Sequence, residues 1–115
     1  MEENKNEKTE ELFMAADHLT DLLFKTQEYL DYLREKERVK GDVECINRIR
    51  RFRELTYEMQ SIADDNRRNE KYRIEKECEE LCTDKRVIDY MQAEVDFIRI
   101  YQEVIKRIIN RIELD

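Results

Sequence analysis

The segment RVIDYMQAEVDFIRIYQEVIKRIINRI, residues 86–112, decides the fold of this chain. When its residues are placed at 100° per position, the apolar side chains cover roughly two-thirds of a helical circumference. A helix that packs on one side needs an apolar stripe of only ~100°. The segment therefore predicts a long final helix that is covered on two sides, partly by other helices of the chain and partly by a second copy of the protein.

The composition of the whole chain favours an all-α fold. A length of 115 residues allows one domain with a modest core, and it leaves little room for a deep active-site cleft. Proline is absent, Gly41 is the only glycine, and 44% of the residues are charged. Strands and tight turns depend on proline and glycine. We therefore expect an antiparallel bundle of four or five helices with a long C-terminal helix.

Local signals divide the chain into helices joined by short turns. Residues 1–8 are polar and are expected to form a disordered tail, so a single helical domain would span residues 9–115. Thr9 is a candidate N-cap, and Gly41 followed by Asp42 predicts a left-handed helix stop and then a new cap. Thr83 or Asp84 should cap the last helix. The four helices before it are expected at about residues 9–25, 27–40, 43–63 and 67–81.

The charge balance argues against nucleic acid and membranes as direct partners. A net charge of −7 opposes attraction to phosphates and to anionic lipids. No segment approaches the ~18 apolar residues of a membrane span, and the N-terminal MEENKNEKTEE is unlike a secretory signal, so a cytoplasmic protein is expected. One basic cluster is dense, but its side chains fan around a helix and indicate a salt-bridged surface: Arg48, Arg50, Arg51 and Arg53.

No catalytic, cofactor or metal site is readable in the sequence. Cys78 and Cys82 are four residues apart and share a helix face, but neither Cys45 nor His18 forms a recognisable second half of a metal site. We interpret Cys78 as a small apolar residue of the helix stripe. His18 has no nucleophile or cleft beside it, and one glycine cannot build a phosphate loop. The prediction is a protein that is not an enzyme and holds no cofactor.

Glu94 is the exception in the apolar surface of the last helix. It falls in the middle of the apolar sweep, where an unpaired carboxylate would cost several kcal/mol to bury. We therefore predict a partner for it, either Arg48 or Arg53 of the third helix, or the hydroxyl of Tyr101. A contact that fixes the register of a helix interface is favoured over a catalytic role.

Several strings of the sequence resemble the YlbF/YmcA family of small bacterial helical proteins, from about Leu12 onward. They are Thr26-Gln27-Glu28-Tyr29-Leu30, the start at Asp42 followed by Phe52-Arg53, and Val87-Ile88-Asp89-Tyr90-Met91-Gln92-Ala93-Glu94 with its isoleucine-rich continuation. The resemblance implies a self-associating helical bundle without enzymatic activity. It also implies a regulator that works with partner proteins in a complex that steers messenger RNA processing by a membrane-bound ribonuclease and affects competence, sporulation and biofilm formation.

One feature of the resemblance is not carried over to this chain. Certain members of the family hold an iron–sulfur cluster with cysteines in a tail beyond the last helix. The cysteines here, at positions 45, 78 and 82, lie inside predicted helices. We therefore predict no cluster.

The leading hypothesis is a regulatory or adaptor protein that forms a homo-oligomer, most simply a dimer, and contacts protein partners through its last helix. The alternatives are a structural oligomer or holdase-like chaperone that uses the same surface, then a metal or redox sensor at Cys78 and Cys82. An enzyme ranks last. The predicted interface consists of Met91, Glu94, Val95, Ile98, Tyr101, Ile105, Ile108 and Ile112.

Overall fold

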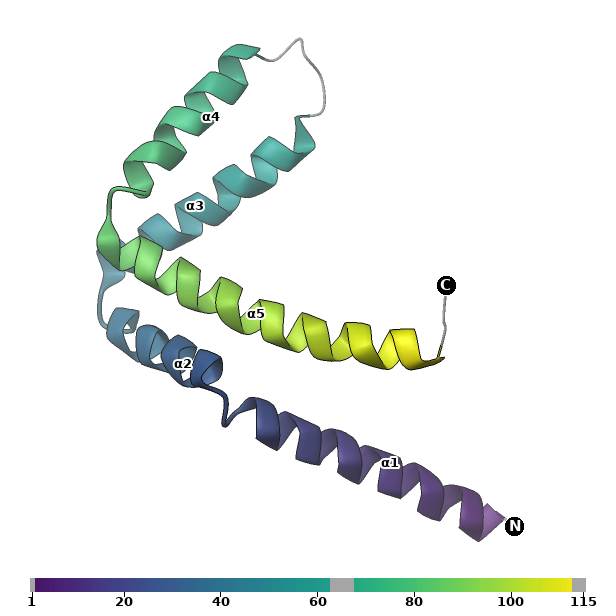
Figure 1. Cartoon of the computed structure of the whole chain (residues 1–115). Helices are drawn as coiled ribbons and strands as arrows, with labels where there is room; N and C mark the ends of the chain where they lie inside the picture. The colour runs from purple at the N-terminus through teal and green to yellow at the C-terminus, as the bar shows by residue number, and fades with distance from the viewer. Residues whose placement is uncertain (1, 63–67, 113–115) are drawn as a thin grey trace.

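A computed structural model describes residues 2–62 and 68–112, and this part of the chain is all-α, as the composition predicts (Figure 1). Five helices follow one another without a strand in the described ranges. They are α1 (Glu2–Leu23), α2 (Gln27–Val39), α3 (Val43–Ser61), α4 (Arg68–Leu81) and α5 (Lys85–Ile112).

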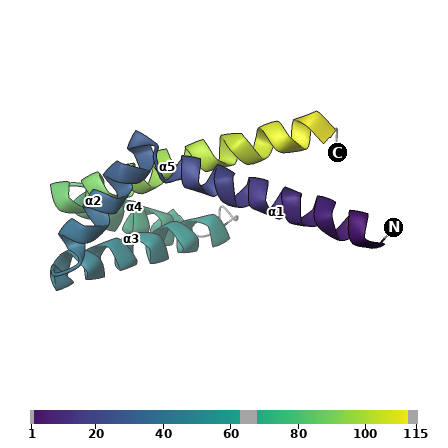
Figure 2. The same cartoon turned by 90° about the horizontal axis from the view of Figure 1, so that it is seen from below.

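The helices form an open arrangement. The radius of gyration is 19.9 Å, whereas a compact domain of this length has a value of about 13 Å. The first half of α5 packs against α2 and α3, and α3 pairs with α4 in a hairpin that projects to one side (Figure 1). On the other side, α1 and the C-terminal half of α5 diverge, and Figure 2 shows the same divergence after a rotation of 90°. The long final helix is therefore covered along only part of its length.

Side-chain caps set the starts of three helices. Thr26 accepts a hydrogen bond from the backbone amide of Tyr29 at 3.2 Å, and Asp42 accepts one from the amide of Cys45 at 3.0 Å. Asp84 accepts the amide of Arg86 at 3.0 Å at the start of α5. These carboxylates and the hydroxyl satisfy amides that have no partner within the first helical turn. The caps predicted at Asp42 and Asp84 are confirmed.

Two expectations about helix ends differ from the structure. Gly41 was expected to take a left-handed backbone angle, but its φ lies outside the left-handed region, and Lys40 before it is still right-handed helical. The short 40–42 turn closes instead through the amide of Asp42, which donates to the carbonyl of Val39 at 2.9 Å. At the other end of the chain, α1 includes residues 2–8, where we expected a tail. That segment has no proline or glycine to prevent the helix from extending.

Two small hydrophobic cores hold the described part of the chain together, and neither contains a residue of α1. The first joins α2, α3 and α5, and the second lies within the α3–α4 hairpin. The first core consists of Val39, Cys45, Ile49, Val87 and Tyr90, and the second of Leu55, Ile62 and Ile74. Because α1 is missing from both, most of its apolar stripe stays exposed, and only Leu19 and Leu23 are half-buried.

Candidate functional site

The candidate site is an apolar groove between α1 and the C-terminal half of α5, called here the α1–α5 groove. Its volume is about 480 Å³, and it lies where the two helices diverge (Figure 1). Leu19 forms the α1 wall. Val104, Ile108 and Ile112 supply the apolar part of the α5 wall, and Arg107 and Arg111 supply its charged part. The groove is thus lined mainly by aliphatic side chains and edged by two guanidinium groups.

The α1 wall is an amphipathic helix with an exposed apolar face. Leu12, Ala15, Leu19 and Leu22 recur at alternating intervals of three and four, which is the spacing of a helix that docks along another helix. Leu12 is 65% exposed, and Leu19 is only half-buried. Full burial of a leucine side chain stabilises a protein by about 1.5–3 kcal/mol, so several such gains remain unused on α1.

The α5 wall shows how the predicted interface divides. Met91 packs against the first core, and Glu94, Val95 and Ile98 are half-buried within the chain. The members of the predicted set that remain exposed belong to the last three turns of the helix: Tyr101, Ile105, Ile108 and Ile112. The apolar surface predicted from the sequence therefore divides along α5. Its first half packs against α2 and α3, and its C-terminal half forms one wall of the groove.

Glu94 and Arg53 form an ion pair between α5 and α3, in which Arg53 donates to the carboxylate. The guanidinium of Arg53 also lies 5.8 Å from the ring centre of Tyr90. The other two candidate partners have different contacts. Arg48 binds Asp84 at 3.0 Å, and the ring of Tyr101 lies against Phe97 with centres 6.4 Å apart. The contact of Glu94 is therefore made within one chain.

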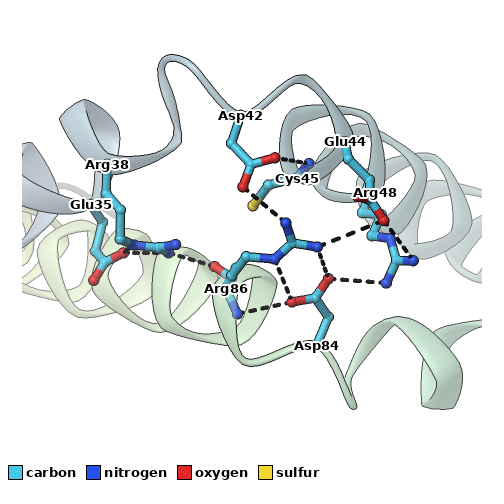
Figure 3. Close-up of polar contacts among 8 residues, drawn as sticks. All are labelled: Glu35, Arg38, Asp42, Glu44, Cys45, Arg48, Asp84 and Arg86. Atoms are coloured by element: carbon cyan, nitrogen blue, oxygen red, sulfur yellow. Dashed lines mark hydrogen bonds and ion pairs between the residues drawn. The ribbon is translucent and has the colours of Figure 1, made fainter.

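A second polar cluster, which the sequence analysis missed, joins the turn before α3 to the turn before α5 (Figure 3). Arg86 binds Asp42 at 2.9 Å and Asp84 at 2.8 Å, and Arg48 binds Asp84 from the other side. Arg38 completes the cluster by donating to the carbonyl of Arg86 at 2.7 Å. We call Arg38, Asp42, Arg48, Asp84 and Arg86 the clasp. It fixes the direction in which α5 leaves the body of the protein.

The contacts of the clasp shift the pKa values of Asp84 and Arg86. The hydrogen bonds from Arg86 hold the pKa of Asp84 at about 2, well below its ordinary value, and the nearby carboxylates raise the pKa of Arg86. Both shifts favour the charged forms, so Asp84 and Arg86 stay ionised at neutral pH. The one sequence signal for it was the pair of predicted caps at positions 42 and 84. Their joint partner, Arg86, is 44 residues from Asp42 and could not be read from local patterns.

The cysteines and the histidine do not assemble into a reactive site. Cys45 is buried in the first core, Cys78 packs against the second, and Cys82 is exposed. Burial raises the pKa of the Cys45 and Cys78 thiols, which disfavours the reactive thiolate. His18 is exposed on α1. Within residues 2–62 and 68–112, no group of three potential ligands could hold a metal ion.

The comparison with protein families matches residues 12–113 to the family described as control of competence regulator ComK, YlbF/YmcA. The chain belongs to the YlbF/YmcA family. The match begins at Leu12, where the apolar stripe of α1 begins, and it extends past Ile112, so both walls of the groove lie in the YlbF/YmcA region. No curated protein and no solved structure matches the chain.

The YlbF/YmcA description identifies a family of regulators, as the sequence resemblance implies. Among the described helices, none combines the length and the apolar character needed to cross a bilayer. The α1–α5 groove, with its mainly aliphatic lining, is the candidate binding site of this regulator in the described part of the chain.

Proposed function

We propose that this chain is a non-catalytic regulatory protein of the cytoplasm that acts by binding proteins through the α1–α5 groove. The main support is that α1 and the C-terminal half of α5, which line the groove, leave apolar side chains exposed to solvent. Contiguous exposed apolar surface of this kind marks protein interaction sites. The regulatory character of the family supports the same role.

The finer proposal is that the protein works in a complex that modulates messenger RNA processing and so affects competence, sporulation and biofilm formation. Its support is the family resemblance together with the family description. The net charge of −7 makes direct RNA binding unfavourable, so in this proposal the protein influences RNA through its protein partners.

Complementation tests this function. Cells that lack the gene receive the wild type, Leu19→Glu or Ile108→Glu, and expression from a ComK-dependent promoter and the processed ends of messenger RNA are measured. Both substitutions place a carboxylate in the groove at positions that water already reaches, so helix content by circular dichroism should be retained. We expect both variants to lose regulation, because a charge cannot be buried cheaply against a partner.

The matched control is Tyr57→Glu on α3, where the side chain is 73% exposed and lies on the α3–α4 hairpin, away from the groove. It removes exposed apolar surface and adds the same charge. We expect wild-type regulation from this variant. Full regulation by Leu19→Glu and Ile108→Glu would show that the groove is not the functional surface.

A further inference from the structure

We propose that the protein binds a small organic acid, namely a carboxylate on an apolar body the size of one aromatic ring, in a cavity where α2, α3 and α5 meet. We call it the junction cavity (Figure 1). Its volume is about 180 Å³, and its lining consists of Val39, Ile46, Ile49, Arg50, Arg53 and Tyr90. The cavity shares no residue with the α1–α5 groove, so this site is separate from the surface of the proposed function.

The floor of the junction cavity is the surface of the first hydrophobic core. Val39, Ile49 and Tyr90 belong to that core, each is more than nine-tenths buried, and Ile46 packs against them. An apolar cavity of ~150 Å³ is large enough to stay dry and to bind benzene. The junction cavity therefore has room for one ring or for an aliphatic body of similar volume.

Two guanidinium groups supply the polar part of the junction cavity. Arg50 and Arg53 are three residues apart on α3, so their side chains are neighbours on one face of the helix. The guanidinium of Arg53 lies 5.8 Å from the ring centre of Tyr90, beside the apolar floor. The lining contains no carboxylate. An apolar floor with two cations beside it is complementary to a ligand that joins an apolar body to an anionic group.

Arg50 is the cation of this cavity that a ligand would neutralise. The other arginines of α3 each pair with a carboxylate: Arg48, Arg51 and Arg53. Arg50 forms no ion pair with any residue in the ranges 2–62 and 68–112, although the chain has 29 acidic residues. Its planar guanidinium matches a carboxylate, which it binds through two parallel hydrogen bonds. This geometry favours a carboxylate over a bare, strongly hydrated anion.

A titration of the full chain followed by isoleucine methyl NMR tests the site. Ile46 and Ile49 report on the junction cavity, whereas Ile108 and Ile112 report on the α1–α5 groove, which also has two arginines. The probe is benzoate. We expect it to shift the signals of Ile46 and Ile49 with a dissociation constant on the order of 0.1–1 mM. Benzyl alcohol, which lacks the charge, and inorganic phosphate, which lacks the apolar body, should each bind roughly 10-fold more weakly or less.

Two variants and a matched control locate the binding. Arg50→Gln, at an exposed position, should weaken benzoate binding roughly 10-fold by removing a charge-assisted contact. Ile46→Phe, at a half-buried position, should fill the cavity and abolish binding. Arg107→Gln removes a guanidinium from the α1–α5 groove instead and should bind benzoate like the wild type.

Thermal unfolding of the same proteins gives a second readout that also checks folding. Benzoate at ten times its dissociation constant should lower the unfolding equilibrium constant of the wild type roughly 11-fold, and so raise its melting temperature. The same concentration should leave the melting temperature of Ile46→Phe unchanged. Cooperative melting of both variants without ligand would show that they are folded.

Three results would overturn this proposal. Benzyl alcohol that binds as tightly as benzoate would mean that the guanidinium groups take no part. Shifts confined to Ile108 and Ile112, or a loss of binding in Arg107→Gln but not in Arg50→Gln, would place the ligand in the α1–α5 groove. Tighter binding of N-acetylphenylalanine, which imitates the end of a protein chain, would mean that the site takes a partner's terminus and not a free acid. Regulation by Leu19→Glu is measured separately, so failure of either proposal is distinguishable.

Discussion

Replacing Glu94 by leucine should leave the protein folded, at nearly wild-type stability, and with an unchanged oligomeric state. The carboxylate of Glu94 pairs with Arg53 of the same chain, so its loss removes no contact between copies. The side chains of Glu94 and Arg53 are 19% and 50% exposed. Water therefore screens the pair, and its contribution belongs to the range of about 0.2–1 kcal/mol measured for exposed ion pairs.

A double-mutant cycle with Arg53→Met measures this coupling directly. We expect a coupling free energy of about 0.5–1 kcal/mol between the two positions, from urea unfolding of the wild type, both single variants and the double variant. Glu94→Leu by itself should cost little, because leucine fits the apolar surface around position 94. Arg53→Met should cost slightly more, since it leaves a half-buried carboxylate without its partner.

Two outcomes would refute this reasoning. A coupling above about 2 kcal/mol would mean that the pair is dry in solution and is buried by something that the isolated chain does not supply. Loss of dimerisation in Glu94→Leu, but not in Arg53→Met, would mean that Glu94 fixes the register between two copies. The conservative variant Glu94→Gln separates charge from shape in either case.

Two further predictions concern the turn before α3 and the clasp. The folded-state pKa of Asp84 is about 2, below its ordinary value of 3.8, so the stability that its ionised carboxylate contributes is complete above about pH 4 and is lost as the pH falls towards 2. The melting temperature of the wild type should therefore drop over this pH window more than that of Asp84→Asn. Parallel curves for the two proteins would contradict the role of the clasp. Gly41→Ala should raise the free energy of unfolding by about 0.4–1 kcal/mol in chemical denaturation. The φ angle of Gly41 lies outside the left-handed region, and an added methyl group meets no atom within 4 Å. A loss of stability would mean that the turn needs glycine.

Much of the fold was predictable because its signals are local. Helical spacing of apolar residues indicated all five helices, and the carboxylates of Asp42 and Asp84 marked two helix starts. The family resemblance, carried by strings such as Val87 to Glu94, is confirmed by the match over residues 12–113. Each of these features depends on residues that are close together in the sequence.

The features that the sequence could not supply are those that depend on long-range geometry. The apolar stripe of α1 would look the same whether it was buried against its own chain or left open. Arg48, Arg53 and Tyr101 were all candidate partners for Glu94, and only the packing of α3 on α5 decided among them. The clasp joins positions 42 and 86, whose contact depends on two turns meeting in space.

The clasp also bears on how the protein folds. The costly step in making a helix is its first turn, and in α3 and α5 that turn is stabilised by a carboxylate that accepts backbone amides. Both carboxylates are held by one guanidinium, that of Arg86. The starts of α3 and α5, which lie 44 residues apart in the chain, therefore share one cation, so loss of Arg86 would weaken the first turns of both helices together.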